Sequence, residues 1–194
     1  MPATERPVFV CAHGAGGHKD DRSMLALAGV LDSFEVVRFD FPYREKGSSR
    51  IDPVSVLKKR IEEVAGEARR EGARLFLGGR SMGGRVASML AAEGFACDGL
   101  LLFAYPLHPA GKPDKLRTEH LPRIAAPVLC VSGTRDPLCT RALMEPVVAP
   151  LPRWTMHWLE GADHSFHVLK ASGHSDAQVM EEVGAAARRW SGSL

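Results

Sequence analysis

The stretch ARLFLGGRSMGGRVASMLAAEG, residues 73–94, joins two kinds of pattern through a glycine-rich junction. Residues 73–79 form a short apolar run that predicts a strand, and residues 82–94 have the apolar spacing of a helix that ends at a glycine. Ser81 lies between them in the pattern G-x-S-x-G. Such a junction fits a plain turn, a phosphate-binding loop, or a sharp bend that carries a nucleophile.

Apolar runs alternate with amphipathic segments along the rest of the chain as well. Six apolar runs predict strands at residues 7–14, 35–42, 73–79, 99–106, 127–133 and 153–160. Apolar residues at helical spacing predict helices at residues 21–33, 52–72, 82–94 and 175–190. This alternation is typical of α/β proteins. We expect one domain over residues 1–194, with a doubly wound, mostly parallel six-stranded sheet and helices on both faces.

Two of the predicted helices have a recognisable start. The first has an acidic residue, Asp21, at its start, and the second opens with Asp52 as the expected N-cap and Pro53 in the first turn. An N-cap oxygen accepts a hydrogen bond from a free amide of the first turn, so Asp52 should fix where the second helix begins.

Composition disfavours several classes of protein. Of the 194 residues, 45% are hydrophobic and 25% charged, and the net charge is only +2, so we expect no nucleic-acid-binding surface. The first residues show no signal-peptide pattern, and no apolar stretch approaches the roughly 20 residues of a membrane span. We therefore expect a cytoplasmic protein. Nothing in the composition indicates an oligomeric state.

The cysteines and histidines show no metal-ligand spacing. No C-x-x-C pair occurs among the four cysteines, which are Cys11, Cys97, Cys130 and Cys139. Three of them lie in or beside apolar runs, so free buried thiols are expected rather than disulfides. Because His18, His108 and His120 also lack ligand spacing, we expect no metal and no cofactor.

Reactive side chains follow three of the predicted strands. Ser81 follows the third strand, Asp136 lies in SGTRD after the fifth, and His164 lies in GADH after the sixth. Ligands of parallel sheets bind at the carboxyl ends of the strands, so these residues should meet at one edge. A serine becomes a nucleophile when an imidazole takes its proton and a carboxylate orients that imidazole. We predict a catalytic triad with Ser81 as nucleophile, His164 as base and Asp136 as orienting acid.

The residues around Ser81 fit a nucleophile elbow, which is a strained strand–turn–helix bend. The two glycines of G-x-S-x-G would let the strand and the helix approach each other closely. The amide of Met82, at the start of the helix, is a candidate oxyanion donor. The loop HGAGG after the first strand would supply a second donor from Gly14 or Ala15.

The predicted site has little sequence available to cover it. Only 20 residues separate Pro106 from Pro127, which is too few for a separate helical cap. We expect an open, shallow site that accepts a small or exposed acyl group. The side chains expected to wall it are Pro42, Tyr43, Tyr105, Leu107 and His108.

Other interpretations of these residues are less favoured. A phosphate-binding loop needs a Lys followed by Ser or Thr, where this chain has an Arg-Val pair. His167 is the main rival of His164 as the base, but it lies further from the strand. Asp163 is interpreted as a solvated neighbour, and His13 as a structural residue whose backbone matters more than its ring. The two arginines of GGRSMGGR are given no role.

Several motifs carry a resemblance to a known family: HGAGG, RFDFPY, GGRSMGGR, YPLHPAGKP followed by LRTEHL, SGTRD and GADHSF. Over residues 7 to about 190 the chain resembles α/β-hydrolases, in particular the small lidless group similar to dienelactone hydrolases. Within that group it looks like the hydrolase-like proteins related to testis-expressed proteins and to a regulatory subunit of the NSL acetyltransferase complex. The resemblance implies that the family's usual first two strands are absent, and that Ser81, Asp136 and His164 are the triad.

The resemblance narrows the expected function without fixing the reaction. Dienelactone hydrolases proper use a cysteine nucleophile where this chain has Ser81, so their specific reaction is not carried over. We expect a serine hydrolase, of carboxylesterase or thioesterase type, that acts on a small-molecule acyl substrate through an acyl-enzyme. Two alternatives stay open: a non-catalytic scaffold with a hydrolase fold, since the related NSL subunit is a regulator, and a small serine peptidase.

Overall fold

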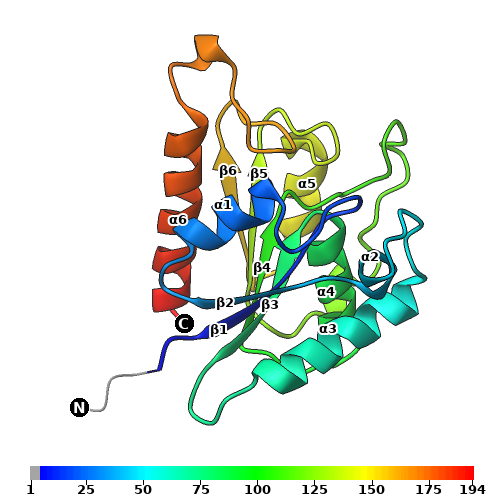
Figure 1. The fold of residues 1–194 in the computed structure, drawn as a ribbon. Coiled ribbons are helices and arrows are strands. Elements are labelled where there is room, and N and C mark those ends of the chain that lie inside the picture. Colours follow the sequence, from blue (N-terminus) through cyan, green and yellow to red (C-terminus); the bar gives the residue numbers. More distant parts are fainter. Residues whose placement is uncertain (1–4) are drawn as a thin grey trace.

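A single parallel sheet forms the centre of the protein (Figure 1). The computed structural model describes residues 5–194. Its strands are β1 (Val8–Ala12), β2 (Glu35–Phe39), β3 (Leu75–Arg80), β4 (Gly99–Phe103), β5 (Val128–Gly133) and β6 (Trp154–Leu159). They lie in the order β2-β1-β3-β4-β5-β6, and every neighbouring pair is parallel. The predicted α/β sheet of six strands is confirmed.

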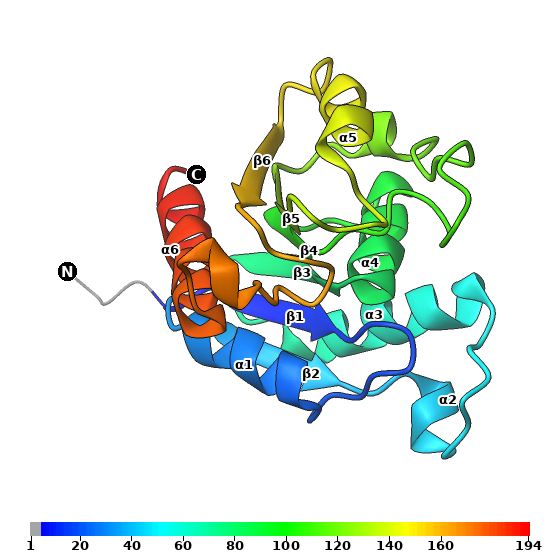
Figure 2. The ribbon, with the colours of Figure 1, turned by 90° about the horizontal axis from the view of Figure 1, so that it is seen from above.

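Helices cover both faces of this sheet (Figure 2). The α-helices are α1 (Arg22–Val30), α2 (Pro42–Glu45), α3 (Val54–Ala68), α4 (Met82–Ala92), α5 (Arg141–Val148) and α6 (Asp176–Gly192). Two 3₁₀ turns are η1 (Leu121–Arg123) and η2 (Lys170–Ser172). None of the helices within residues 5–194 combines the length and the apolar character that crossing a membrane requires.

Alternate residues of each central strand enter different hydrophobic clusters. In β1, Val8 and Val10 pack with the buried faces of α3, α4 and α5, whereas Phe9 and Cys11 pack with those of α1 and α6. All of β1, β4 and β5 is buried, which explains why these strands are continuous apolar runs. The core therefore consists of two layers separated by the sheet.

The helix starts agree with the sequence in one case and correct it in the other. Asp21 caps α1 by accepting a hydrogen bond of 2.9 Å from the Met24 amide. The prediction for Asp52 is wrong, because Pro53 is the N-cap of α3 and no side chain caps that helix. A residue that precedes proline is held in an extended conformation, which leaves Asp52 one position too early to cap the first turn.

The strand order places two loops beside each other at the carboxyl edge of the sheet. From β1 the chain crosses to β2 on one side, and from β3 it crosses to β4 on the other. Ala12 at the end of β1 pairs in register with Gly79 near the end of β3. This reversal between neighbouring strands is where ligands of such sheets bind. The HGAGG loop and Ser81 are consequently neighbours.

Candidate active site

Ser81 lies on a strained bend between β3 and α4. Its backbone has φ 51° and ψ −116°, outside the regions that residues with a side chain commonly adopt. The Ser81 amide donates a hydrogen bond of 2.8 Å to the carbonyl of Phe103 at the end of β4, which holds this conformation. Strain of this kind is stored where the surrounding structure over-determines the backbone, and functional sites are common among such places.

Glycines make the bend possible by removing side chains where backbones meet. A Cβ atom on Gly79 would lie 2.1 Å from the Ala12 carbonyl oxygen, and one on Gly83 would lie 2.4 Å from the same atom. Gly78 faces Leu101 of β4 in the same way, at 1.9 Å, which the sequence did not reveal. A larger residue at Gly79 or Gly83 would push β3 or α4 away from β1, and one at Gly78 would push β4 away from β3.

Ser81, His164 and Asp136 form a continuous chain of hydrogen bonds. His164 Nε2 lies 3.0 Å from Ser81 Oγ, and His164 Nδ1 lies 2.8 Å from Asp136 Oδ2. Asp136 is buried, and its other oxygen accepts a hydrogen bond of 2.8 Å from the Leu138 amide. An ionised Asp136 can only accept, so Nδ1 carries the proton and Nε2 is free to accept one from Ser81. The structure thus brings together the three residues that the sequence predicted as a triad.

The loop that carries His164 is shaped by the residue before it. Asp163 Oδ1 accepts hydrogen bonds from the amides of Ser165 at 2.7 Å and His167 at 3.1 Å. Phe166 takes a left-handed conformation with φ 63° within this turn. Asp163 is therefore more than the solvated neighbour that the sequence suggested. The available signal was an aspartate two residues before a serine, a common turn former.

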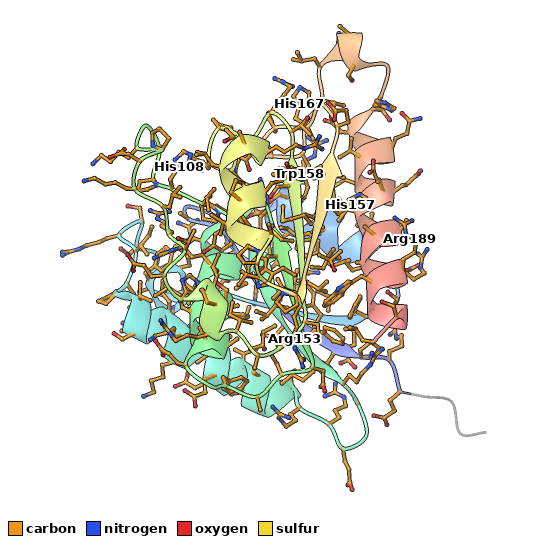
Figure 3. All side chains as sticks on the ribbon, turned by 180° about the vertical axis from the view of Figure 1, so that it is seen from behind. His108, Arg153, His157, Trp158, His167 and Arg189 are labelled. Atoms are coloured by element: carbon orange, nitrogen blue, oxygen red, sulfur yellow. The ribbon has the colours of Figure 1, made fainter. Side chains whose placement is uncertain are left out.

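The rival histidine has a different partner. His167 Nδ1 lies 2.9 Å from Asp176 Oδ2 at the start of α6, and the His167 side chain is exposed. Figure 3 shows His167 at the end of β6, well separated from His108 on the loop after β4. Its ring is engaged with α6 rather than with Ser81.

The HGAGG loop is fixed by the buried ring of His13. Nδ1–H donates a hydrogen bond of 2.8 Å to the Gly14 carbonyl, and Nε2 accepts one of 3.3 Å from the Phe41 amide. Burial lowers the pKa of His13, which favours this neutral form. The ring itself therefore joins the first loop to the end of β2, a role that the sequence interpretation had given mainly to the backbone.

The candidate oxyanion donors lie next to Ser81. A Cβ atom on Gly14 would be 3.4 Å from that of Ser81, and Met82 is the first residue of α4, where amides lack an intrahelical partner. Across residues 5–194 no protein acceptor is found for the amides of Met82, Gly14 or Ala15. These amides are available, and their role as an oxyanion hole stays a prediction.

The predicted wall residues lie deeper than expected. Tyr43, Tyr105 and Leu107 belong to the hydrophobic cluster under α3 and α4, and His108 is also buried. The Tyr105 hydroxyl donates a hydrogen bond of 2.8 Å to the Arg117 carbonyl, so its polar end is satisfied inside the protein. Of the five, Pro42 alone is partly exposed. A substrate-binding role for these residues stays a prediction, and in this conformation the four buried side chains offer a ligand almost no surface.

A second serine and histidine also meet, inside the packing between α4 and η1. Ser88 Oγ lies 2.8 Å from His120 Nε2, and both residues are buried. Ser88 donates its proton to the Arg85 carbonyl at 2.7 Å, so His120 must donate to the serine. Burial, with Arg85 and Arg123 nearby, lowers the pKa of His120 to about 4. Nothing in the sequence spacing indicated this contact.

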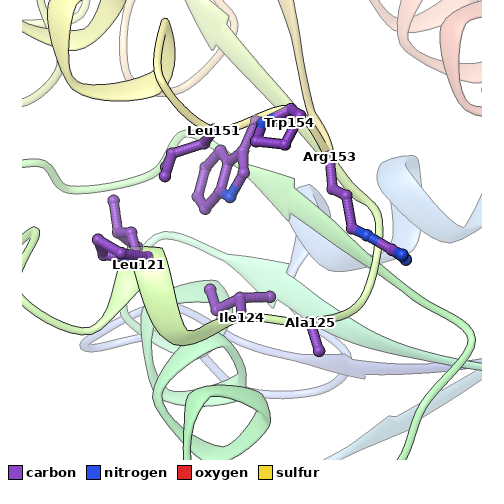
Figure 4. Close-up of a pocket in the computed structure, with 8 residues that line it drawn as sticks. Leu121, Ile124, Ala125, Leu151, Arg153 and Trp154 are labelled. Carbon is purple, nitrogen blue, oxygen red and sulfur yellow. The ribbon is translucent and has the colours of Figure 1, made fainter.

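Two concave regions lie away from Ser81. One of about 260 Å³ is lined by the end of η1, the segment before β5 and the start of β6, with Trp154 and Arg153 on one wall and Ile124 opposite (Figure 4). The other, of about 360 Å³, lies between β6 and the C-terminal half of α6. The first is at the amino end of the strands, opposite Ser81. Neither includes a residue of the predicted triad.

Solved structures with the same fold include several hydrolases. A lidless serine hydrolase from Xanthomonas campestris has 20% identity and a TM-score of 0.70, over 98% of this chain and 86% of that one. Est1E from Butyrivibrio proteoclasticus, with bound ferulic acid, has 16% identity and a TM-score of 0.75, over 97% and 90%. A dienelactone hydrolase from Anabaena variabilis has 19% identity and a TM-score of 0.70, over 97% and 88%.

At these identities the likeness shows a shared fold and nothing finer. The sequence itself gives the stronger finding, because residues 5–192 match the family described as alpha/beta hydrolase domain. That match covers nearly the whole chain, including the elbow and the loops after β1, β5 and β6. The chain therefore belongs to the alpha/beta hydrolase domain family.

Proposed function

We propose that this protein is a serine hydrolase of the carboxylesterase or thioesterase type, with Ser81, His164 and Asp136 as its catalytic triad. The observation that carries the proposal is the pair of hydrogen bonds at 3.0 Å and 2.8 Å that links these side chains on a strained bend. The family and the esterase and lipase structures with this fold support a hydrolase. The choice of ester or thioester is part of the proposal.

Each group has one task in the proposed reaction. Ser81 Oγ attacks the carbonyl carbon of the substrate while its proton moves to His164 Nε2. The oxygen that becomes negative accepts hydrogen bonds from the Met82 amide and from Gly14 or Ala15. The carbonyl C–O or C–S bond then breaks, and the leaving group takes the proton from Nε2. Water then attacks the acyl-enzyme with His164 as base, which releases the acid and restores Ser81.

The substrate is proposed to be a small or exposed acyl compound. The 20 residues between Pro106 and Pro127 form a loop with η1 and no helical cap. A resemblance to NSL-type regulatory subunits keeps a scaffold role as the alternative, and the connected triad favours the enzyme because a scaffold needs no such hydrogen-bonded chain.

A panel of substrates tests the proposal. Acetyl and butyryl esters, a thioester, a feruloyl ester, a palmitoyl ester and a peptide amide are compared by kcat/KM, with Ser81→Ala as the matched control. We expect the short esters or the thioester to be preferred and Ser81→Ala to lose at least about 10³-fold. Equal turnover by Ser81→Ala contradicts the triad, and a strong preference for palmitoyl contradicts the open site.

A further inference from the structure

Arg80 contacts the loop of His164 from the residue next to the nucleophile. Its guanidinium Nη2 donates a hydrogen bond of 2.8 Å to the backbone carbonyl of His164, 84 positions away in the sequence. The side chain is half-buried at the end of β3. The proposed reaction uses no atom of Arg80, and the sequence interpretation gave it no role.

The charge of Arg80 is surrounded by carboxylates that have other partners. Burial lowers the pKa of the Arg80 guanidinium, while Asp21, Asp136 and Asp163 favour its charged form. Asp21 caps α1, Asp136 holds His164, and Asp163 shapes the loop after β6. Within the described residues none of them forms a direct ion pair with Arg80. The guanidinium therefore reaches the His164 backbone without pairing with the carboxylate of Asp136.

The backbone geometry explains why this contact matters. Ser81 and Arg80 are neighbours at the rigid end of β3. A hydrogen bond from Arg80 to the His164 backbone therefore holds the serine and the histidine in a fixed relative position. The loop of His164 is also held by its own turn, by Asp176 at the start of α6, and by contacts with the loop after β5, such as the Arg135 bond of 3.0 Å to the Gly161 carbonyl. Small displacements of a catalytic base reduce turnover strongly.

We propose that Arg80 is a positioning residue that fixes His164 against Ser81. The kinetic part rests on the proposed function, whereas the structural part does not. His164 is bound by Ser81 and Arg80 from the end of β3 and by Asp136 from the loop after β5. Loss of the Arg80 bond should therefore let the imidazole move relative to Ser81.

The first test is hydrogen exchange of the backbone amides of residues 161–168, which requires no turnover. Exchange rates are compared in the wild type, Arg80→Gln, Arg80→Lys and Arg135→Gln. Arg135 is the matched control because it also donates to a carbonyl of this loop but is exposed. We expect Arg80→Gln to accelerate exchange around His164 by about tenfold. Arg80→Lys should accelerate it less, and Arg135→Gln should leave exchange around His164 nearly unchanged.

Activity supplies the second readout. In Arg80→Gln, kcat for a short ester should fall about tenfold with KM nearly unchanged, and Arg80→Lys should recover part of the loss. Wild-type exchange in Arg80→Gln overturns the proposal whether or not the protein is an esterase. Faster exchange in Arg80→Gln, together with a wild-type protein that has no turnover, overturns the proposed function and leaves the role of Arg80 standing.

A folding defect is checked separately. If Arg80→Gln does not fold, Arg80→Lys is compared with the wild type by hydrogen exchange of residues 161–168 and by kcat. The lysine keeps the charge but not the forked reach, so exchange should accelerate and kcat should fall by about threefold. Unchanged exchange and unchanged kcat in that variant overturn the positioning role.

Discussion

Two serine–histidine contacts in this protein have almost the same length and opposite surroundings. Ser81 and His164 are 3.0 Å apart at the carboxyl edge of the sheet, and Ser88 and His120 are 2.8 Å apart beneath α4. His164 has Asp136 on its other nitrogen, whereas His120 forms no ion pair with a carboxylate among the residues described. His164 is partly exposed, and His120 is buried.

The difference teaches that distance alone does not identify a nucleophile. At Ser81 the carboxylate of Asp136 fixes the proton on Nδ1, so Nε2 can accept from the serine. At Ser88 the hydroxyl proton goes to the Arg85 carbonyl, and the histidine donates instead. The first contact has the arrangement that the proposed acyl transfer requires. The second satisfies two buried polar groups and links α4 to η1, which is a structural task.

The two contacts should differ most in the effect on kcat/KM of replacing each histidine by alanine. His164→Ala should reduce kcat/KM for a short ester by about 10³-fold or more, because Ser81 then has no base. His120→Ala should change it by less than about threefold at 25 °C, since its ring contacts no reacting group. Both are measured on samples shown to be folded by circular dichroism. A comparable loss in the two variants would remove the distinction between the contacts.

The free energy of unfolding should show the reverse order, with the larger change at the Ser88 contact. Ser88→Ala leaves the buried His120 N–H without its acceptor, so the free energy of unfolding should fall by about 1–3 kcal/mol in urea titrations. Ser81→Ala keeps the strained backbone and removes a partly exposed hydroxyl, so its change should stay within about 0.5 kcal/mol. A larger destabilisation by Ser81→Ala than by Ser88→Ala would contradict the structural role of the second contact.

The pH dependence of stability should come in part from His120. Its pKa is lowered from 6.5 to about 4 in the folded protein, so the unfolded chain binds a proton between these values and the folded chain does not. His120 therefore does not affect the free energy of unfolding above pH 6.5, and its protonation lowers that free energy as the pH falls toward 4, by about 3 kcal/mol at most. Unfolding free energies at a series of pH values check this, with His120→Asn expected to have a flatter slope. Equal slopes would assign the effect to other groups.

The sequence predicted the sheet because buried parallel strands are recognisable as continuous apolar runs. Continuous apolar runs such as residues 99–103 can lie only inside. The expectation that Ser81, Asp136 and His164 meet came from a second rule, that the loops after parallel strands lie at one edge of the sheet, together with the G-x-S-x-G pattern around Ser81. Asp52 was misjudged because capping depends on one residue of register, which Pro53 shifts.

Features that depend on loop geometry were beyond the sequence. The turn that Asp163 forms, the bond from Arg80 to His164 and the contact of Ser88 with His120 all require knowing how a loop folds back. The burial of Tyr105 and Leu107 has the same origin, since the loop after β4 turns inward at these residues. Sequence patterns indicate which residues lie at one edge of the sheet, but not how deeply each side chain is buried.

Covalent labelling with a fluorophosphonate, followed by peptide mass spectrometry, tests the central claim most directly. The reagent modifies a serine only when a base activates it, so it reads both contacts in one experiment. We predict prompt modification of Ser81, none of Ser88, and loss of labelling in His164→Ala but not in His120→Ala. Folded wild-type protein that stays unlabelled, or that is labelled at Ser88, would contradict the assignment of Ser81 as the nucleophile.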